Sequence, residues 1–85
     1  MAEVIIYSKA NCPYCVHAKN LLIDKGVSFQ ELRIDLDPEA FSAMEEIVPQ
    51  ARTVPQIIIN GQPIGGFDDL KALNDAGKLE ELLNQ

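Results

Sequence analysis

Two short apolar runs, separated by a segment with helical spacing, constrain the fold of this chain more than any other feature. Residues Glu3 to Ser8 (EVIIYS) are rich in β-branched side chains and stop at a polar KAN, which predicts a strand. The segment from Pro13 to Lys25 has apolar residues at helical spacing, and Gly26 supplies the left-handed residue that often ends a helix. Val27 to Ile34 predicts a second strand. Because a strand–helix–strand unit connects parallel strands, these two strands should be parallel neighbours.

A second helix is predicted where Asp37, Pro38 and Glu39 meet. The aspartate suits a helix N-cap, the proline suits the first helical position, and the glutamate is favourable in the first turn. The predicted buried face of this helix consists of Phe41, Met44, Ile47 and Val48.

The rest of the chain predicts a hairpin and two short helices. Pro55 to Asn60 and Gln62 to Gly65 are strand-like, and the Asn60-Gly61 pair between them is typical of a two-residue hairpin turn. Helices are expected at about Asp68 to Asp75 and Lys78 to Leu83. The order β-α-β-α-β-β-α-α predicts an α/β, thioredoxin-like fold, a four-stranded mixed sheet with helices on both faces. We expect a single domain over residues 1–85.

Charge and hydropathy argue against two classes of function. The chain has 7 basic and 13 acidic residues, a net charge of −6, whereas a nucleic-acid-binding protein needs a basic face to displace counterions. No apolar run approaches the ~18 residues of a membrane-spanning helix. The N-terminus MAEVIIYS lacks the basic flank and long apolar stretch of a signal peptide. We therefore expect a cytoplasmic protein that binds neither nucleic acid nor membrane.

The only two cysteines, Cys12 and Cys15, are separated by two residues. With His17 they offer three ligands, one too few for a four-ligand zinc site. A disulfide between them would link two points that already lie close together in a helix, which disfavours a structural role. In a reducing compartment such a pair is more often catalytic or metal-binding. A redox pair is the favoured interpretation, and a metal or cluster site is the alternative.

The position of the pair predicts different roles for its two sulfurs. Cys12 falls at the predicted helix N-cap, where unpaired N–H groups and the helix dipole favour a thiolate, and Lys9 adds a positive charge nearby. Cys15 lies one turn further on, on an apolar face made with Ala18, Leu22 and the flanking Val16 and Leu21. Burial there should raise the pKa of Cys15. We therefore predict that Cys12 attacks and Cys15 resolves.

Three motifs stand in order along the chain: Cys12–Cys15 (CPYC), Thr53–Pro55 (TVP) and Gly65–Asp69 (GGFDD). Together they closely resemble the dithiol glutaredoxins, and the resemblance extends over the whole chain. Thioredoxins, the neighbouring family, usually carry a tryptophan before their cysteines, and this chain has none. The resemblance implies a glutathione-dependent thiol–disulfide oxidoreductase that reduces glutathione mixed disulfides and protein disulfides through Cys12 and Cys15.

The resemblance also implies a glutathione site made of Lys9, Tyr14, Arg52, Thr53, Val54, Pro55, Gly66, Phe67 and Asp68. In such a site the Val54–Pro55 bond is cis, and the Val54 backbone pairs with the cysteinyl part of glutathione. The helix that starts near Asp68 would offer N–H groups to the γ-glutamyl carboxylate. The Asp68 side chain would hold the adjacent ammonium or simply cap the helix.

The other implied site residues have plainer alternatives. Lys9 and Arg52 would meet the glycyl carboxylate or be ordinary surface charges, and Tyr14 would flank glutathione or only cover the helix start. His17 is expected to face solvent rather than shuttle protons. Phe67 is a departure, because many relatives have cysteine there. Since the contact at that position is mainly through the backbone, we expect glutathione binding to survive.

The implied partners are glutathione, as co-substrate, and glutathionylated proteins and protein disulfides. No metal is expected, and the chain should be a monomer. One alternative is a thioredoxin-like reductase charged by a flavoprotein. Another is a carrier in which two chains share a [2Fe–2S] cluster through Cys12 and two glutathiones. Cluster-binding relatives usually have glycine or serine where Pro13 stands, or a single cysteine, so Pro13 disfavours the carrier.

Overall fold

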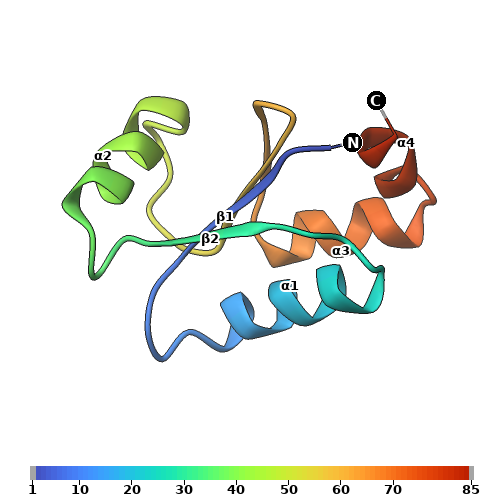
Figure 1. Ribbon diagram of the computed structural model, residues 1–85, viewed down its shortest axis with the longest axis horizontal. Coiled ribbons are helices and arrows are strands. Elements are labelled where there is room, and N and C mark those ends of the chain that lie inside the picture. Colours follow the sequence, from blue (N-terminus) through green and yellow to red (C-terminus); the bar gives the residue numbers. More distant parts are fainter. Residues whose placement is uncertain (1, 85) are drawn as a thin grey trace.

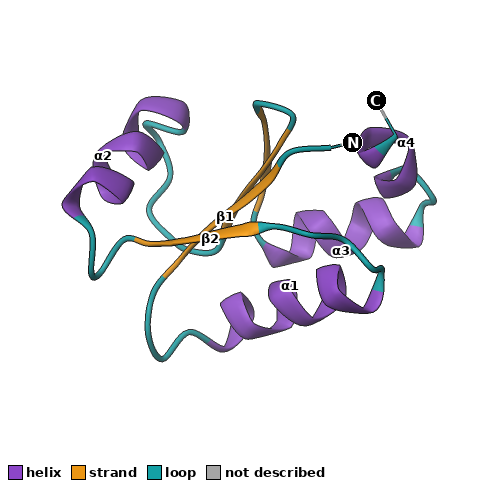
Figure 2. Cartoon of the chain, viewed as in Figure 1, coloured by secondary structure: helices purple, strands orange, loops and turns teal. Residues whose placement is uncertain are grey.

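The computed structural model describes residues 2–84, and its strands and helices follow one another in the predicted order (Figure 1, Figure 2). The strands are β1 (Val4–Ser8), β2 (Gln30–Arg33), β3 (Gln56–Ile59) and β4 (Gln62–Gly65). The helices are α1 (Pro13–Asp24), α2 (Pro38–Ile47), α3 (Phe67–Asp75) and α4 (Leu79–Leu83).

The strands form one mixed sheet in the order β2-β1-β3-β4. As predicted, β1 runs parallel to β2, and β3 runs antiparallel to β4; β1 and β3 are also antiparallel. Ile6 in β1 lies opposite Glu31 on one side and Ile57 on the other. Because β1 is a central strand, the loop that leads from it to the cysteines starts at the middle of the sheet.

Helices cover both faces of the sheet, because alternate side chains of a strand point to opposite sides. On one face Ile6 packs in a buried cluster with Leu22 of α1 and Leu70 of α3. On the other face Tyr7 packs in a smaller cluster with Met44 of α2. Figure 1 shows α1 and α3 lying side by side, with α2 on the opposite side of the strands. The predicted thioredoxin-like fold is confirmed.

The predicted helix start and hairpin turn are present in the structure. The Asp37 carboxylate caps α2 by accepting the backbone N–H of Glu39 at 2.9 Å. Asn60 (φ 53°) and Gly61 (φ 78°) both adopt the left-handed conformation that a tight two-residue hairpin requires. These features were predictable because each depends on a few neighbouring residues.

The predicted buried face of α2 is partly wrong. Phe41 and Ile47 are 42% and 38% exposed. The buried stripe of the helix instead follows Ala40, Met44 and Val48 at four-residue spacing, and the two large side chains lie at its edges.

The second strand and the face of α1 also differ from the prediction. β2 begins at Gln30 rather than Val27, because the N–H of Val27 donates to the Leu22 carbonyl at 2.9 Å and finishes α1 instead of extending the sheet. Val16 is 49% exposed, since the buried stripe of α1 follows Cys15, Ala18 and Leu22.

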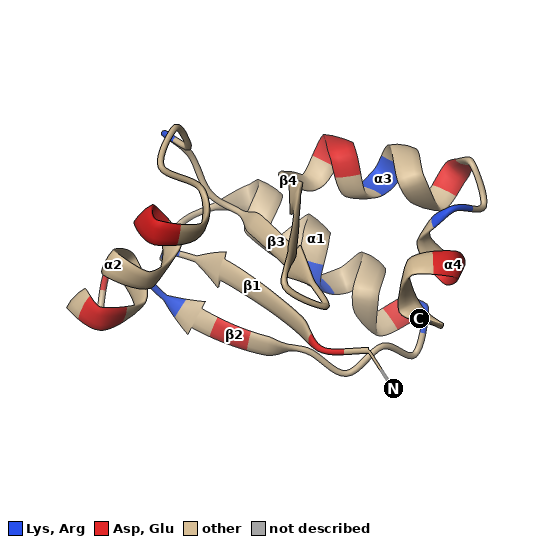
Figure 3. Ribbon diagram, turned by 90° about the horizontal axis from the view of Figure 1, so that it is seen from above, with Lys and Arg blue, Asp and Glu red and all other residues tan. Residues whose placement is uncertain are grey.

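Charged side chains concentrate on particular parts of the surface. Acidic residues gather on α2, α3 and α4 (Figure 3). Two ion pairs involve β2 or the residues just after it: Lys19 with Glu31, and Arg33 with Asp35. Between residues 2 and 84, no helix combines the length and the apolar character needed to cross a membrane.

Candidate active site

Cys12 occupies the N-cap of α1, and Pro13 is the first helical residue, as predicted. The Cys12 backbone is extended, and its sulfur accepts the backbone N–H of Cys15 at 3.2 Å. That N–H is one of the groups at a helix start that have no partner within the helix. The partly exposed sulfur therefore lies at the positive end of the helix dipole.

The loop before Cys12 is attached to the end of β2. Asp35 accepts the backbone N–H of Ala10 at 3.1 Å and pairs with the Arg33 guanidinium at 2.7 Å. Chiefly because of the hydrogen bond from Arg33, the pKa of Asp35 lies well below its ordinary range, so this carboxylate stays charged. Asn11 turns the chain with a φ of 57°, a conformation that asparagine tolerates better than most residues. These contacts fix the approach to the Cys12 sulfur.

Cys15 differs from Cys12 in that it is buried, with 2% of its surface exposed. Burial raises the pKa of Cys15 to about 11, and a hydrogen bond to Cys12 together with the nearby Cys12 charge acts in the same direction. A backbone hydrogen bond from Lys9 and the charge of Lys19 oppose the rise. The predicted increase in the pKa of this thiol is confirmed.

A groove of about 430 Å³ runs from the first turn of α1 to the first turn of α3. It brings together seven of the predicted site residues: Tyr14, Thr53, Val54, Pro55, Gly66, Phe67 and Asp68. The Val54–Pro55 bond is cis, as the resemblance implied. The Cys12 thiol donates to the Val54 carbonyl at 3.7 Å, so the sulfur lies beside this groove. Gly65 and Asp69 of the GGFDD motif also line it, as does Gln56, which no sequence motif had singled out.

The first turn of α3 is capped by Asp69 rather than Asp68. The helix begins at Phe67, its N-cap is Gly66, and the Asp69 carboxylate accepts the Gly66 N–H at 3.1 Å. The alternative that Asp68 caps this helix is therefore wrong. Gly65 has a φ of 119°, and a Cβ there would lie 2.2 Å from a carboxylate oxygen of Asp69. Glycine at this position lets the Asp69 carboxylate reach back over the turn.

Three rings meet where the two helices begin. Tyr14 and Phe67 are stacked, with ring centroids 6.2 Å apart and planes 25° apart. The exposed His17 ring lies 5.6 Å from Phe67 and 6.1 Å from Tyr14. The prediction that His17 faces solvent is confirmed. Phe67 thus becomes part of an aromatic wall at one end of the groove.

Lys9 and Arg52 are not brought into this groove. Lys9 is exposed and lines a second cleft, of about 580 Å³, together with Cys12, Cys15, Lys19, Glu31 and Arg33. Arg52 is exposed next to Thr53 and is not among the residues that line either cleft. Sequence reasoning assigned no role to Glu31, Arg33 or Lys19. Lys19 lies on the helix beyond the CPYC motif and follows Cys15 by about one helical turn, which was the available signal.

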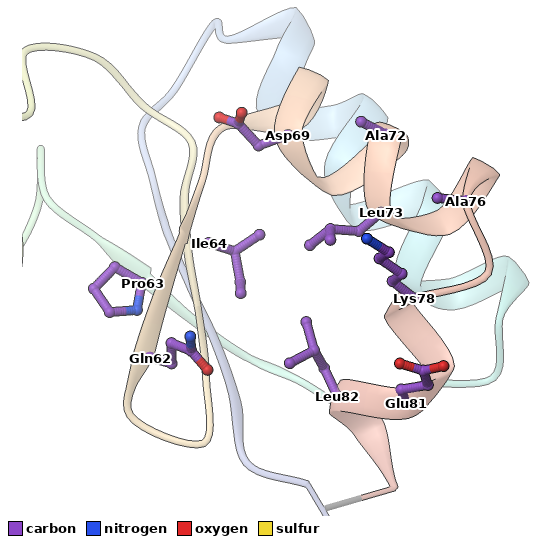
Figure 4. Close-up of a pocket in the computed structure, with 10 residues that line it drawn as sticks. All are labelled: Gln62, Pro63, Ile64, Asp69, Ala72, Leu73, Ala76, Lys78, Glu81 and Leu82. Carbon is purple, nitrogen blue, oxygen red and sulfur yellow. The ribbon is translucent and has the colours of Figure 1, made fainter.

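A third hollow, of about 590 Å³, lies between β4, α3 and α4. Figure 4 shows Ile64, Leu73 and Leu82 pointing into it, with Asp69 at one end. No cysteine is among the residues that line it. Among residues 2–84 no three His, Cys, Asp or Glu side chains gather where they could hold a metal ion, and the absence of a metal stays a prediction.

Comparison with known proteins identifies the family of this chain. The sequence model of the family described as Glutaredoxin matches residues 4–64. Glutaredoxin 3 of Escherichia coli (strain K12) is 53% identical over 85 residues, which cover 98% of this chain and 99% of that protein. The chain belongs to the glutaredoxin family. As a glutaredoxin it is a thiol–disulfide oxidoreductase.

Solved glutaredoxin structures have the same fold. The solution structure of glutaredoxin from Brucella melitensis superposes with a TM-score of 0.83 at 47% identity, over 98% of this chain and 89% of that one. The crystal structure of a buckwheat glutaredoxin–glutathione complex superposes with a TM-score of 0.85 at 30% identity, over 98% of this chain and 77% of that one. The fold on which the groove is built is therefore that of the family.

Proposed function

We propose that this glutaredoxin uses glutathione to reduce glutathione mixed disulfides and protein disulfides through Cys12 and Cys15. The observation that carries the proposal is the Cys12 sulfur 3.7 Å from the Val54 carbonyl, at the side of a groove that ends at the start of α3. The related buckwheat protein, which was solved with glutathione, supports it. We also propose that the protein works in the cytoplasm as a monomer without a resident metal.

Glutathione would lie along the groove, with its sulfur at Cys12 and its γ-glutamyl end at the start of α3. The cysteinyl backbone would pair with Val54 as a short antiparallel strand does. The γ-glutamyl carboxylate would meet the backbone N–H groups of Phe67 and Asp68, because the first N–H groups of a helix have no partner within it. The exposed Asp68 carboxylate would hold the ammonium.

The glycyl end of glutathione would lie toward the cationic side of the site. Lys9 lies beside Cys12, and Arg52 adjoins Thr53 of the groove. Although the net charge is −6, screening acts over about 8 Å in physiological salt, so these nearby cations outweigh distant acids. Lys9 is the better placed of the two because it lines the same cleft as the Cys12 sulfur.

Each chemical step is a thiol–disulfide exchange. The Cys12 thiolate attacks the glutathione sulfur of a mixed disulfide, the original S–S bond breaks, and the substrate thiolate leaves and takes a proton from water. Cys12 is then bonded to glutathione. A second glutathione thiolate attacks that glutathione sulfur, which releases glutathione disulfide and returns Cys12 as a thiolate. For a protein disulfide, Cys15 instead displaces the substrate and forms the Cys12–Cys15 disulfide, which glutathione reduces.

The proposal is tested by turnover of a glutathionylated peptide with glutathione, glutathione reductase and NADPH. We expect the wild type and Cys15→Ser to consume NADPH, and Cys12→Ser to be inactive while keeping its circular dichroism spectrum. Cys15→Ser should fail only with protein disulfides. If the wild type is inactive although both thiols titrate as free, glutathione dependence is wrong, and reduction by a flavoprotein reductase or cluster binding would be measured next.

A further inference from the structure

A small network of polar groups lies behind Cys15 and has no role in the steps above. Lys19 follows Cys15 by four residues on α1, so both side chains lie on the same face of the helix. The Lys19 ammonium lies 2.9 Å from a carboxylate oxygen of Glu31 on β2, and the Ser8 hydroxyl donates to the same oxygen at 2.6 Å. Ser8 is fully buried at the end of β1. The position of the ammonium is thus set by two strands.

This network lines the same cleft as the Cys15 side chain. The charged groups that face the cleft are Lys19 of α1, Lys9 of the preceding loop, and Glu31 and Arg33 of β2. Arg33 is engaged by Asp35 at 2.7 Å. Figure 3 shows β2 at the edge of the sheet with an acidic and a basic segment along it. Lys19 and Arg33 are both held in ion pairs at this cleft, and Lys19 is the one that lies on the same helix face as Cys15.

The reaction changes what surrounds Cys15. In the reduced protein, burial raises the pKa of Cys15 most, followed by its hydrogen bond to Cys12, and the Cys12 charge adds to both; Lys19 and the Lys9 backbone oppose them. Once Cys12 is part of a mixed disulfide it carries no charge, and its sulfur becomes a poorer acceptor for the Cys15 thiol. The positive charge of Lys19, which favours the Cys15 thiolate, is not removed by that step.

We propose that Lys19, held by Glu31 and Ser8, is a positioning residue that stabilises the Cys15 thiolate after Cys12 has entered a mixed disulfide. The inference rests on the proposed roles of the two cysteines. In the step concerned, the Cys15 thiol gives its proton to water in the cleft, and the thiolate attacks the Cys12 sulfur. The Cys12–Cys15 bond forms, the bond from Cys12 to the substrate sulfur breaks, and the substrate leaves as a thiolate.

The Lys19–Glu31 contact is more than a simple surface ion pair, because the buried Ser8 hydroxyl also donates to the Glu31 carboxylate. An exposed ion pair contributes little to stability. Lys25 at the end of α1 forms such a pair with Glu80, and its side chain is 29% exposed, against 27% for Lys19. Lys25 is therefore a matched control: the same residue type, the same helix and a similar exposure, but far from the cleft of Cys15.

The test is rapid mixing of the reduced protein with 4,4′-dithiodipyridine between pH 5 and pH 12, a range that extends past the pKa of about 11 of Cys15 in the reduced protein, following the released thiopyridone. The first release reports attack by Cys12, and the second reports attack by Cys15 on the resulting Cys12 mixed disulfide. We expect Lys19→Met to raise the midpoint pH of the second phase by about one unit, as the loss of a nearby opposite charge does. Lys19→Arg should stay close to the wild type, and Lys25→Met should match it.

The expected change in rate has an unusual sign at high pH. At pH 7 the thiolate fraction of Cys15 should be about tenfold smaller in Lys19→Met. Each remaining thiolate is more basic and therefore about threefold more nucleophilic, at a Brønsted slope of about 0.45. The second phase should thus be about three- to fourfold slower. Above the midpoint the more basic thiolate should react about threefold faster than in the wild type. A wild-type pH profile in Lys19→Met, or the same slowing at every pH, would overturn the inference. Absence of the first release in the wild type would instead contradict the proposed role of Cys12.

Discussion

Helices α1 and α3 begin side by side, with Tyr14 of one stacked on Phe67 of the other, but different groups cap their first turns. At α1 the cap is the Cys12 sulfur, which accepts the backbone N–H of Cys15. At α3 the cap residue is Gly66, and Asp69 reaches back from within the helix to accept the Gly66 N–H. One helix start presents a nucleophilic sulfur, whereas the other presents none.

The difference shows how the same feature of helices can serve chemistry or binding. The unpaired N–H groups of a helix start favour an anion in both places. At α1 the anion is the protein's own thiolate, so substitutions there should change the reaction. At α3 the proposed anion is the γ-glutamyl carboxylate, so substitutions there should change stability and affinity.

The largest expected effect is a difference in alkylation rate between Cys12, which caps α1, and the buried Cys15. Since the pKa of Cys15 is raised to about 11, only about one Cys15 in a thousand is a thiolate at pH 8. We expect iodoacetamide at pH 8 to modify Cys12 at least a hundredfold faster than Cys15, and Cys15 to gain about tenfold per pH unit up to that pKa. Mass spectrometry of tryptic peptides checks the sites, and the unfolded protein should react at both. Equal native rates would show that Cys15 is not protected.

The next effect concerns the backbone at the start of α3. Gly65→Ala places a methyl group against Asp69 at a φ of 119°. We expect the free energy of unfolding to fall by about 2–4 kcal/mol, from backbone strain together with a displaced cap. Urea unfolding measures the loss. Gly61→Ala is the control, because its φ is 78° and a Cβ there meets nothing within 4 Å, so about 1 kcal/mol is expected. Losses of equal size would mean that Asp69 is not crowded by residue 65.

A smaller effect separates the two neighbouring aspartates of α3. Asp68→Ala and Asp69→Ala each remove one acid from the first turn, but only Asp69 accepts the Gly66 N–H. We expect Asp69→Ala to be about 1 kcal/mol less stable than Asp68→Ala. Asp68→Ala should instead raise the KM for glutathione severalfold. Urea unfolding and steady-state kinetics give the two quantities, and a reversed order in either would reverse the assigned roles.

The smallest effect is a pH-dependent change in stability from the polar network behind Cys15. The hydrogen bond from Ser8, and then that from Lys19, lower the pKa of Glu31 in the folded protein. A lowered pKa stabilises the fold above the unfolded value of about 4.3, and this contribution is lost as the pH falls through the folded value. We expect Glu31→Gln to lose about 0.5–1 kcal/mol at pH 7, and this loss to shrink as the pH falls below the unfolded value of about 4.3. A loss that stays constant across that range would show that the Glu31 charge is not responsible.

How much the sequence could predict depended on how local each feature is. The start of α1 at Pro13, the cap of α2 at Asp37 and the Asn60-Gly61 turn need only adjacent residues, and all three are present. For α3 the sequence suggested Asp68 as a possible cap, whereas the structure uses Gly66 and Asp69. The choice of Gly66 and Asp69 depends on the Gly65 conformation and on Phe67 packing against Tyr14, which lies on another helix.

The network around Cys15 was harder to predict because it joins three elements. In the sequence, Glu31 looks like an ordinary charged residue of an edge strand. Ser8 looks like the last residue of a buried strand. Only the parallel pairing of β1 and β2 brings Ser8 near Glu31, and only the packing of α1 brings Lys19 to the same oxygen. The exposure of Phe41 and Ile47 has a similar cause, since the sheet beneath α2 buries only one narrow stripe.

The most direct test of the proposed glutathione groove is NMR of Cys15→Ser with Cys12 bonded to glutathione. Backbone amide shifts relative to the reduced variant locate the bound tripeptide. We predict the largest changes outside the CPYC turn at Val54, Phe67 and Asp68, along the groove between α1 and α3. Changes centred on Lys19, Glu31 and Arg33 would place glutathione in the second cleft, and would contradict the assignment of the α3 start as its binding site.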